Sequence, residues 1–406
     1  MNIIKGGVTA PKGFLASGVK AGIKKSGRLD FGLLYSEVPA FAAASFTKNR
    51  FQASPVKVSK KYLGNKTHQA VVVNSGNANC ANGKIGDKDA ANMAKLVGEG
   101  LLLGDKEVLV ASTGIIGHYL PIEKIESAVP ELVACLSAAN GSIFAQAIMT
   151  TDTVKKELAV RVKLGSATVT IGGACKGVGM LYPDMKTQMH ATMLSFISTD
   201  ALITKKMLAR SLDEAIADSF NMVSVDGDMS TNDSCFILAN GLAKNRCIKS
   251  NGKDYDKFTT ALKYLCKELA KLLAVDGEGA TKFIEIRVVG AKSVDDARKI
   301  ARKISTSNLL KCAVCGEDPN WGRVVAAAGA GGVDFDPDKA DVYLGNMKAL
   351  LNGQSIKNFD RAKAQKIFQK KKVYITVDLK SGKAGATAWT CDFSKEYVVI
   401  NSEYST

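Results

Sequence analysis

Helix-like and strand-like apolar patterns follow one another along this chain without a regular order, and this limits the kind of sheet that it can form. Apolar residues recur at helical spacing near residues 88–101, 123–136, 204–219, 256–273 and 293–304. Between them lie strand-like runs, namely AVVVN after Gln69, EVLVAS after Lys106, LAVRVKL and ATVTIGG around a turn at Gly165, CFILAN, KFIEIRVVG and VYITVDL. Adjacent strands joined by turns predict an α/β chain of the α+β type, a mixed sheet packed by helices rather than a regular doubly wound sheet.

Local signals refine two of these elements. Ser293 is a good N-cap for the last helical stretch, and Asp295 and Asp296 supply the negative charge that suits a helix N-terminus. Near the C-terminus, VYITVDL is followed by a turn at Ser381–Lys383 and a second strand. This order predicts a β-hairpin.

The size and composition of the chain indicate an ordinary globular protein. Its 406 residues, 46% of them hydrophobic, suffice for a large core or two lobes, and no linker rich in proline or serine divides them. The N-terminus has no apolar signal region, and no apolar run is long enough to span a bilayer. Nine scattered cysteines suit a reducing compartment. We therefore expect a cytoplasmic protein with no membrane partner.

The charge and the cysteines raise two further possibilities. A net charge of +16 and the cluster Lys370–Lys372 would suit a nucleic-acid-binding protein, but the basic residues are spread without interleaved aromatic residues. A solvated basic surface that attracts carboxylate-bearing substrates is the favoured interpretation, and salt-dependent retention on DNA would distinguish the two. Cys312 and Cys315 form a CxxC without a second pair, so we expect no metal site.

The segment KGVGMLYPDMKTQMHATMLSF, from Lys176 to Phe196, places a threonine in an apolar run after a glycine-rich turn. A threonine hydroxyl is a poor nucleophile unless an adjacent group removes its proton, and its own free α-amine does so once the preceding peptide bond is cut. Thr192 is the candidate. Composition alone favours the ordinary interpretation of ATMLSF as a buried β-strand that contains a threonine.

Several motifs recur together along the whole chain. They are GGVTAPKGF, FTKNRFQASPV, NSGNANCANG, STGIIG, MTTDT, DGEGATK, GEDPNWGR and NSEYST. With ATML, these motifs resemble those of the ornithine acetyltransferase (glutamate N-acetyltransferase) family of arginine biosynthesis, which are self-cleaving enzymes.

The resemblance implies a fold and an activity. The fold would be layers of helix, sheet, sheet and helix, as in the DmpA and ornithine acetyltransferase fold. Cleavage between Ala191 and Thr192 would produce an α chain, residues 1–191, and a β chain, residues 192–406, and two such pairs would form a heterotetramer. The enzyme would transfer acetyl from N2-acetyl-L-ornithine to L-glutamate without a metal or organic cofactor. The sequence leaves open whether acetyl-CoA is also a donor.

The resemblance also assigns roles to individual residues. Thr192 would attack the acetyl carbonyl and carry the acetyl group, while the Thr113 hydroxyl and the Gly114 amide would form the oxyanion hole. The substrate-binding residues would be Thr150, Lys176, Thr192, Glu278, Asn401 and Thr406. Each residue also has an ordinary interpretation. STG alone is a common turn, Lys176 would be a solvated turn lysine, and Glu278 would pair with a neighbouring lysine. Thr150 would be a strand residue whose role belongs instead to Thr151, and Asn401 and Thr406 would lie in a frayed tail. The loops VDGDMSTNDS and GEDPNWGR receive no chemical role.

One departure from the family pattern leaves two positions for the nucleophile. Family members place ATML close behind the proline, whereas Lys186–His190 is inserted here. A nucleophile at Thr187 would lie at the family's usual distance from Lys176 in the sequence. A nucleophile at Thr192 would instead lie within the motif ATMLSF, which is followed by STDA. Thr192 is favoured because the nucleophile must begin a strand whose apolar residues hold it in the core. An amidase or aminopeptidase of similar architecture, which releases free acetate without glutamate, is the alternative enzyme.

Overall fold

The strand-like runs in the first two thirds of the chain form one mixed sheet of nine strands. The computed structural model describes residues 1–182 and 193–403. The strands of this sheet are β1 (Asn2–Ile4), β2 (Phe14–Val19), β3 (Phe31–Phe46), β4 (His68–Asn77), β5 (Val108–Ile115), β6 (Lys156–Leu164), β7 (Ala167–Lys176), β8 (Leu194–Thr199) and β9 (Ser234–Ala239). Their order is β1-β6-β7-β8-β9-β3-β4-β5, with β2 paired to β3.

The long strand β3 divides this sheet into two layers. Its first part, Phe31–Tyr35, pairs with β2 and β4, and its last part, Phe41–Phe46, pairs with β9. The change of partner occurs around Pro39, which has no backbone N–H to donate to a ladder. One continuous strand thus contributes to both layers.

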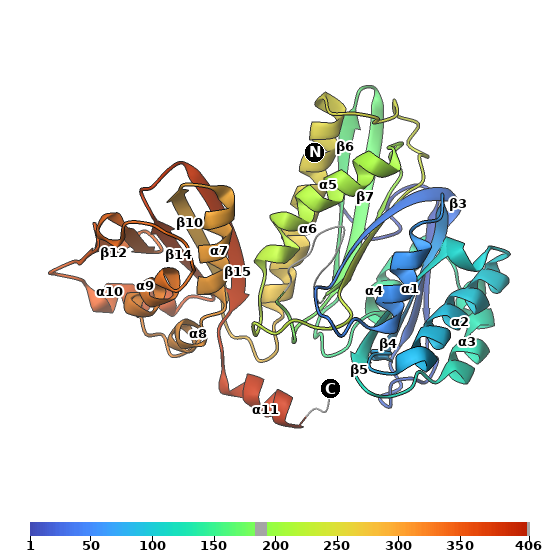
Figure 1. The fold of residues 1–406 in the computed structure, drawn as a ribbon, viewed down its shortest axis with the longest axis horizontal. Helices are drawn as coiled ribbons and strands as arrows, with labels where there is room; N and C mark the ends of the chain where they lie inside the picture. The colour runs from blue at the N-terminus through green and yellow to red at the C-terminus, as the bar shows by residue number, and fades with distance from the viewer. Residues whose placement is uncertain (183–192, 404–406) are drawn as a thin grey trace.

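Apolar residues from the two layers meet in a shared core. Phe196 of β8 stacks on Phe236 of β9, and Phe144 meets the edge of the Phe196 ring. On the other face of β8, Ile197 belongs to the core under the helices α5 (Lys205–Ala217) and α6 (Lys253–Val275). The helices α1 (Ser54–Tyr62), α2 (Gly83–Leu101) and α3 (Ile122–Ala134) cover the opposite side, and α4 (Gly141–Ala147) packs on β2. Figure 1 therefore shows the expected layers of helix, sheet, sheet and helix.

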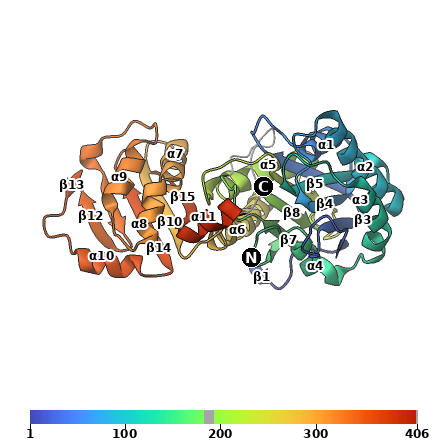
Figure 2. The same cartoon turned by 90° about the horizontal axis from the view of Figure 1, so that it is seen from below.

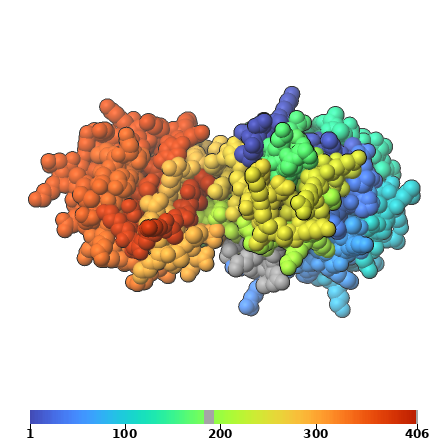
Figure 3. Space-filling model, turned by 90° about the horizontal axis from the view of Figure 1, so that it is seen from above, coloured from blue at the N-terminus to red at the C-terminus, as the bar shows by residue number. Residues whose placement is uncertain are grey.

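The last third of the chain forms a second lobe around a six-stranded sheet. Its strands are β10 (Phe283–Ala291), β11 (Asp341–Leu344), β12 (Met347–Leu351), β13 (Gln354–Ser355), β14 (Lys372–Asp378) and β15 (Ala384–Cys391), in the order β13-β12-β11-β14-β10-β15. Its helices are α7 (Val294–Ser305), α8 (Asn308–Cys315), α9 (Trp321–Gly329) and α10 (Arg361–Phe368). Short 3-10 turns lie at Asp105–Glu107, Ala138–Asn140, Phe220–Met222 and Pro337–Lys339. In the space-filling view the two lobes meet at a narrow waist (Figure 3).

The predicted β-hairpin near the C-terminus is wrong. β14 and β15 do not pair with each other, because β10 lies between them, parallel to β14 and antiparallel to β15. The side chains of Ile284, Ile286 and Val288 on β10 are fully buried. A strand with this much apolar surface is more stable in the centre of a sheet than at its edge.

Other local predictions are confirmed. All five predicted helices are present with similar bounds, and the Ser293 side chain accepts a hydrogen bond from the Asp296 amide as an N-cap. Gly165, at φ +58°, forms the turn between β6 and β7. No helix in residues 1–182 and 193–403 has both the length and the apolar character needed to cross a membrane.

A final helix connects the two lobes. α11 (Lys395–Glu403) follows β15 and extends from the second lobe back towards the first (Figures 1 and 2). Through α11, residues from the end of the chain reach the site described next.

Candidate active site

A cavity of about 300 Å³ lies at one end of the nine-stranded sheet, where the ends of β5 and β7 meet α11. Its walls come from six separate segments of the chain. The lining residues are Thr113, Gly114, Ile116, Thr150, Thr151, Lys176, Gly179, Met180, Asp226, Asp228, Met229, Ser230, Thr231, Asn232, Glu278, Tyr397 and Asn401. The cavity thus gathers six residues singled out from the sequence, namely Thr113, Gly114, Thr150, Lys176, Glu278 and Asn401.

The corner formed by Thr113 and Gly114 depends on close contact between two parallel strands. Gly114 of β5 lies opposite Gly76 of β4, where the ladder is irregular. Gly114 has φ +134°, and a Cβ atom there would overlap the backbone of Gly76 and Asn77. Only glycine fits this position, since the left-handed backbone and the close approach both exclude a side chain. This geometry holds the Thr113 hydroxyl beside the cavity.

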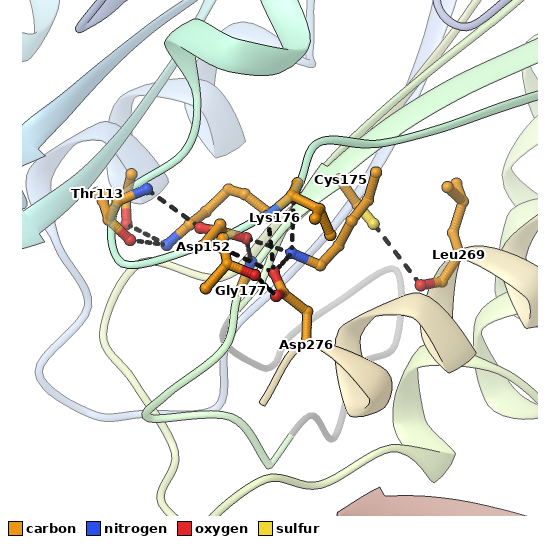
Figure 4. Close-up of polar contacts among 11 residues, drawn as sticks. Thr113, Asp152, Cys175, Lys176, Gly177, Leu269 and Asp276 are labelled. Atoms are coloured by element: carbon orange, nitrogen blue, oxygen red, sulfur yellow. Dashed lines mark hydrogen bonds and ion pairs between the residues drawn. The ribbon is translucent and has the colours of Figure 1, made fainter. Parts of the chain in front are cut away.

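Lys176 joins two of the threonines. Its ammonium group donates a hydrogen bond to the Thr113 hydroxyl at 3.2 Å (Figure 4). It donates a second hydrogen bond to the Thr150 hydroxyl at 2.7 Å. Lys176 is the last residue of β7 and is almost fully buried. Burial lowers its pKa, although the nearby Asp152 carboxylate opposes this shift. Lys176 is therefore a buried lysine and not the solvated turn lysine that composition alone would suggest.

A buried network of opposite charges holds the segment around Lys176. Asp152 accepts hydrogen bonds from the Lys156 ammonium at 2.7 Å and from the Gly177 amide at 2.9 Å, and Asp276 also pairs with Lys156 (Figure 4). Burial alone would raise the pKa of Asp152, but Lys176 and Lys156 outweigh it and lower that pKa. Asp152 therefore stays ionised and orients the turn that carries Lys176. Sequence reasoning missed this aspartate, although it lies within the motif MTTDT.

Glu278 and Asn401 meet on the far wall of the cavity. The Asn401 amide donates a hydrogen bond to the Glu278 carboxylate at 3.0 Å, which links α11 to the loop after α6. Glu278 also lies against Gly179, where a Cβ atom would overlap its carboxylate. Asn401 is therefore part of the cavity wall, in contrast to the frayed tail that its sequence position would suggest.

The loop VDGDMSTNDS, to which the sequence assigned no role, supplies another part of the wall. Asp226 accepts hydrogen bonds from the amides of Met180 at 2.6 Å and Leu181 at 2.8 Å, and from the Tyr397 hydroxyl at 3.3 Å. Burial raises the pKa of Asp226 and also that of Tyr397, where the negative charge of Asp226 adds to the effect. The sequence signal for a role of this loop was its density of polar residues between two buried runs, but that density is also typical of ordinary loops.

Asp233 lies near the end of this loop and has an unusual environment. Its side chain is fully buried, and neither carboxylate oxygen has a hydrogen-bond partner in the part of the chain that the structure describes. Burial raises the pKa of this carboxyl group well above its usual value, although Lys176 opposes the shift. A buried carboxyl group without partners favours the neutral form.

Ala191, Thr192, Thr406 and the inserted segment Lys186–His190, which contains Thr187, lie outside the described residues. The chain is described again from Met193. Leu194, the next residue, pairs with Lys176 of β7 on one side and with Ser234 of β9 on the other. The strand that follows Thr192 in sequence therefore begins beside the lysine that lines the cavity.

Comparisons with known proteins identify close relatives over the whole chain. The profile of the ArgJ family matches residues 15–406. The arginine biosynthesis bifunctional protein ArgJ of Dehalococcoides mccartyi is 49% identical over 403 residues, which cover 99% of this chain and 98% of that protein. The protein of the same name from Caldanaerobacter subterraneus is 46% identical and covers 100% of both chains.

A solved structure is similar to part of the chain. The crystal structure of the arginine biosynthesis bifunctional protein argJ from Bacillus halodurans is 38% identical, with a TM-score of 0.51. The match covers 52% of this chain and 100% of the solved chain.

Proposed function

Because this chain belongs to the ArgJ family, and is therefore an acyltransferase of arginine biosynthesis with glutamate N-acetyltransferase activity, we propose that it carries the acetyl group on Thr192. N2-acetyl-L-ornithine is the donor and L-glutamate the acceptor. The observation that carries this proposal is the cavity in which the Lys176 ammonium bonds the hydroxyls of Thr113 and Thr150, beside the start of β8.

The reaction begins with cleavage between Ala191 and Thr192, which frees the Thr192 α-amine. This amine accepts the hydroxyl proton as the Thr192 oxygen attacks the acetyl carbonyl. The Thr113 hydroxyl and the Gly114 amide donate hydrogen bonds to the oxygen that becomes negative. When the C–N bond of the acetamide breaks, the amine of ornithine leaves with the proton, and the acetyl group remains on Thr192. Glutamate then attacks this ester and reverses the step.

Substrate recognition follows from the two signs of charge in the cavity. The Lys176 ammonium on one wall suits a carboxylate, while Glu278, Asp226 and Asp228 on the other suit an ammonium group. Thr150, Lys176, Glu278 and Asn401 bind the amino acid, with Thr192 and Thr406 completing the set. Both substrates are amino acids, so one cavity serves both halves of the exchange.

The two fragments remain one catalytic unit after cleavage. Within the nine-stranded sheet, β8 and β9 follow the cut in sequence, yet they lie between β7 and β3, which precede it. The solved chain from Bacillus halodurans is matched over its whole length yet covers only 52% of this chain. A break near the middle of the 406 residues, where Thr192 lies, is consistent with that length. Residues 1–191 thus form the α chain and residues 192–406 the β chain, and two such pairs assemble into a heterotetramer.

Two finer properties complete the proposal. The word bifunctional in the names of the relatives supports acetyl-CoA as a second acetyl donor. The nine cysteines are all free, which supports the reducing cytoplasm as the compartment.

The test combines intact-mass analysis, N-terminal sequencing and an acetyl-transfer assay. We expect two fragments, one beginning at Thr192, and acetyl transfer from N2-acetylornithine to glutamate. Thr192→Ala abolishes both cleavage and transfer, whereas the matched control Thr187→Ala retains both. A processed, active Thr192→Ala protein would overturn the assignment, and a fragment beginning at Thr187 would move the nucleophile to that residue.

A further inference from the structure

A second and larger hollow adjoins the active-site cavity. This groove has a volume of about 1100 Å³ and is lined by Lys20, Lys24, Gly27, Arg28, Leu29, Gln146, Met149, Thr150, Thr151, Asp152, Thr153, Val154 and Lys155. It shares Thr150 and Thr151 with the cavity of Lys176. A ligand that occupies the groove would therefore have one end beside the reacting groups.

The groove is strongly positive. Lys20, Lys24, Arg28 and Lys155 contribute four cations. Within the described residues, neither Lys20 nor Arg28 forms an ion pair. The single carboxylate of the lining belongs to Asp152, which already binds Lys156 and the Gly177 amide. The groove therefore has positive charge available for an anionic ligand.

The loop that carries three of these cations has a fixed conformation. Asp30 is fully buried and accepts hydrogen bonds from the amides of Ala21 and Ile23, each at 2.6 Å, and Lys24, at 2.8 Å. Three such bonds to one carboxylate hold the start of the loop. Arg28 and Lys20 thus stand at the two ends of an ordered loop.

Lys24 joins the groove to the oxyanion corner. Its ammonium donates hydrogen bonds to the carbonyl oxygens of Leu29 at 2.8 Å and Met149 at 2.6 Å. A Cβ atom added to Gly76 would lie 2.9 Å from the Lys24 side chain, so Lys24 packs against the glycine that faces Gly114. Burial lowers the pKa of Lys24 to about 8. An anion bound in the groove would stabilise its charged form.

The size and charge of the groove exceed what an amino-acid substrate needs. The cavity of about 300 Å³ suits an amino acid, whereas about 1100 Å³ lined by cations suits a ligand as large as a nucleotide with several phosphates. We propose that the groove binds the phosphate-bearing part of an acyl-coenzyme A donor, with the thioester arm reaching the cavity past Thr150 and Thr151. This inference rests on the proposed function.

The chemistry of this donor is the same as that of acetylornithine, with a different leaving group. The proposed threonine nucleophile forms a C–O bond to the acetyl carbon, the C–S bond breaks, and the coenzyme A thiol leaves with the proton that the threonine hydroxyl gave up. No further reactant is needed, and glutamate accepts the acetyl group in the second step.

Calorimetric titration with coenzyme A tests the groove directly. We expect the double variant Lys20→Ala/Arg28→Ala to bind coenzyme A at least about tenfold more weakly than the unsubstituted protein, because two phosphate contacts are lost. The charge-preserving variant Lys20→Arg/Arg28→Lys should retain most of the affinity. The matched control Lys357→Ala/Lys383→Ala removes two exposed lysines from the second lobe and should bind normally. Pantetheine, which lacks the phosphates, should bind all four proteins weakly.

Kinetics with both donors separates this inference from the proposed function. In Lys20→Ala/Arg28→Ala, we expect KM for acetyl-CoA to rise at least about tenfold more than KM for N2-acetylornithine. Equal affinity of this variant and the unsubstituted protein for coenzyme A, or no binding to either, would overturn the groove assignment. Absence of transfer from N2-acetylornithine to glutamate in the unsubstituted protein would instead overturn the proposed function.

Discussion

At the scale of single residues, the site combines ionised groups with a carboxyl group that favours the neutral form. Asp152 stays ionised because Lys176 and Lys156 surround it, whereas Asp233 is buried without a hydrogen-bond partner in the described chain. The two aspartates differ only in their partners. Residue type alone therefore does not predict the charge state of either group.

The environment of Asp233 predicts how stability depends on pH. The fold raises the pKa of Asp233 above its value in the unfolded chain. The stability that the protein has with Asp233 protonated is therefore fully present below the unfolded-state pKa and is lost as pH rises through the folded-state pKa. The loss amounts to about 1.4 kcal/mol for each pH unit between the two pKa values. Asp233→Asn removes this dependence, so the variant should become the more stable protein as pH rises from 4 to 8.

Urea unfolding at several pH values, at one protein concentration, measures this effect. Glu126→Gln, which changes an exposed carboxylate on α3, is the control and should follow the unsubstituted protein at every pH. If the unfolding free energies of Asp233→Asn and the unsubstituted protein stay parallel from pH 4 to 8, Asp233 is not held neutral by the fold.

At the scale of elements, α11 lines the candidate active-site cavity, which its position at the end of the chain does not suggest. The helix is mostly exposed, but Tyr397 donates a hydrogen bond to Asp226 and Asn401 donates one to Glu278, and both acceptors line this candidate cavity. Amphipathic periodicity did not reveal α11, because few of its residues pack against a core. Polar contacts over long sequence distances hold it in place.

This arrangement predicts an effect of Asn401→Ala on substrate binding. The substitution removes the hydrogen bond to Glu278, so KM for N2-acetylornithine should rise about three- to tenfold, with a smaller change in kcat. Ser402→Ala is the neighbouring control, since the Ser402 hydroxyl bonds only the Val399 carbonyl within the described chain. Steady-state kinetics that give the same KM for both variants would exclude a role of Asn401 in binding.

At the scale of the whole molecule, the two proposed fragments share one sheet. β8 pairs with β7, and β9 pairs with β3, so strands on either side of the proposed cut form continuous ladders. Phe196 and Phe236, both after the cut, pack in the core with residues that precede it. Separation of the fragments would expose this core to water.

Co-elution tests this consequence. Both fragments should elute together in size-exclusion chromatography under native conditions and should separate only in denaturant, because apolar burial contributes about 25 cal/mol for each Å². The uncut Thr192→Ala variant provides the elution position of a covalently intact chain. Fragments that separate in native buffer would contradict a single catalytic unit.

The sequence alone determined the five helices with clear apolar periodicity, and it determined the family. Helical spacing located α5, α6 and α7, and Ser293 marked a helix start, because these signals depend on residues within one or two turns of each other. The family motifs singled out Thr113, Gly114 and Lys176 together. A family resemblance indicates such residues even where their spacing and composition favour an ordinary turn.

Only the tertiary structure decided which distant segments meet. β10 separates β14 from β15, Asp226 reaches both the turn at Met180 and the helix α11, and Lys20 and Arg28 form a groove with residues 149–155. Each contact joins segments far apart in sequence, and each depends on how the whole chain buries its apolar surface and satisfies its buried polar groups. Those free energies belong to the complete fold, so no local pattern records them.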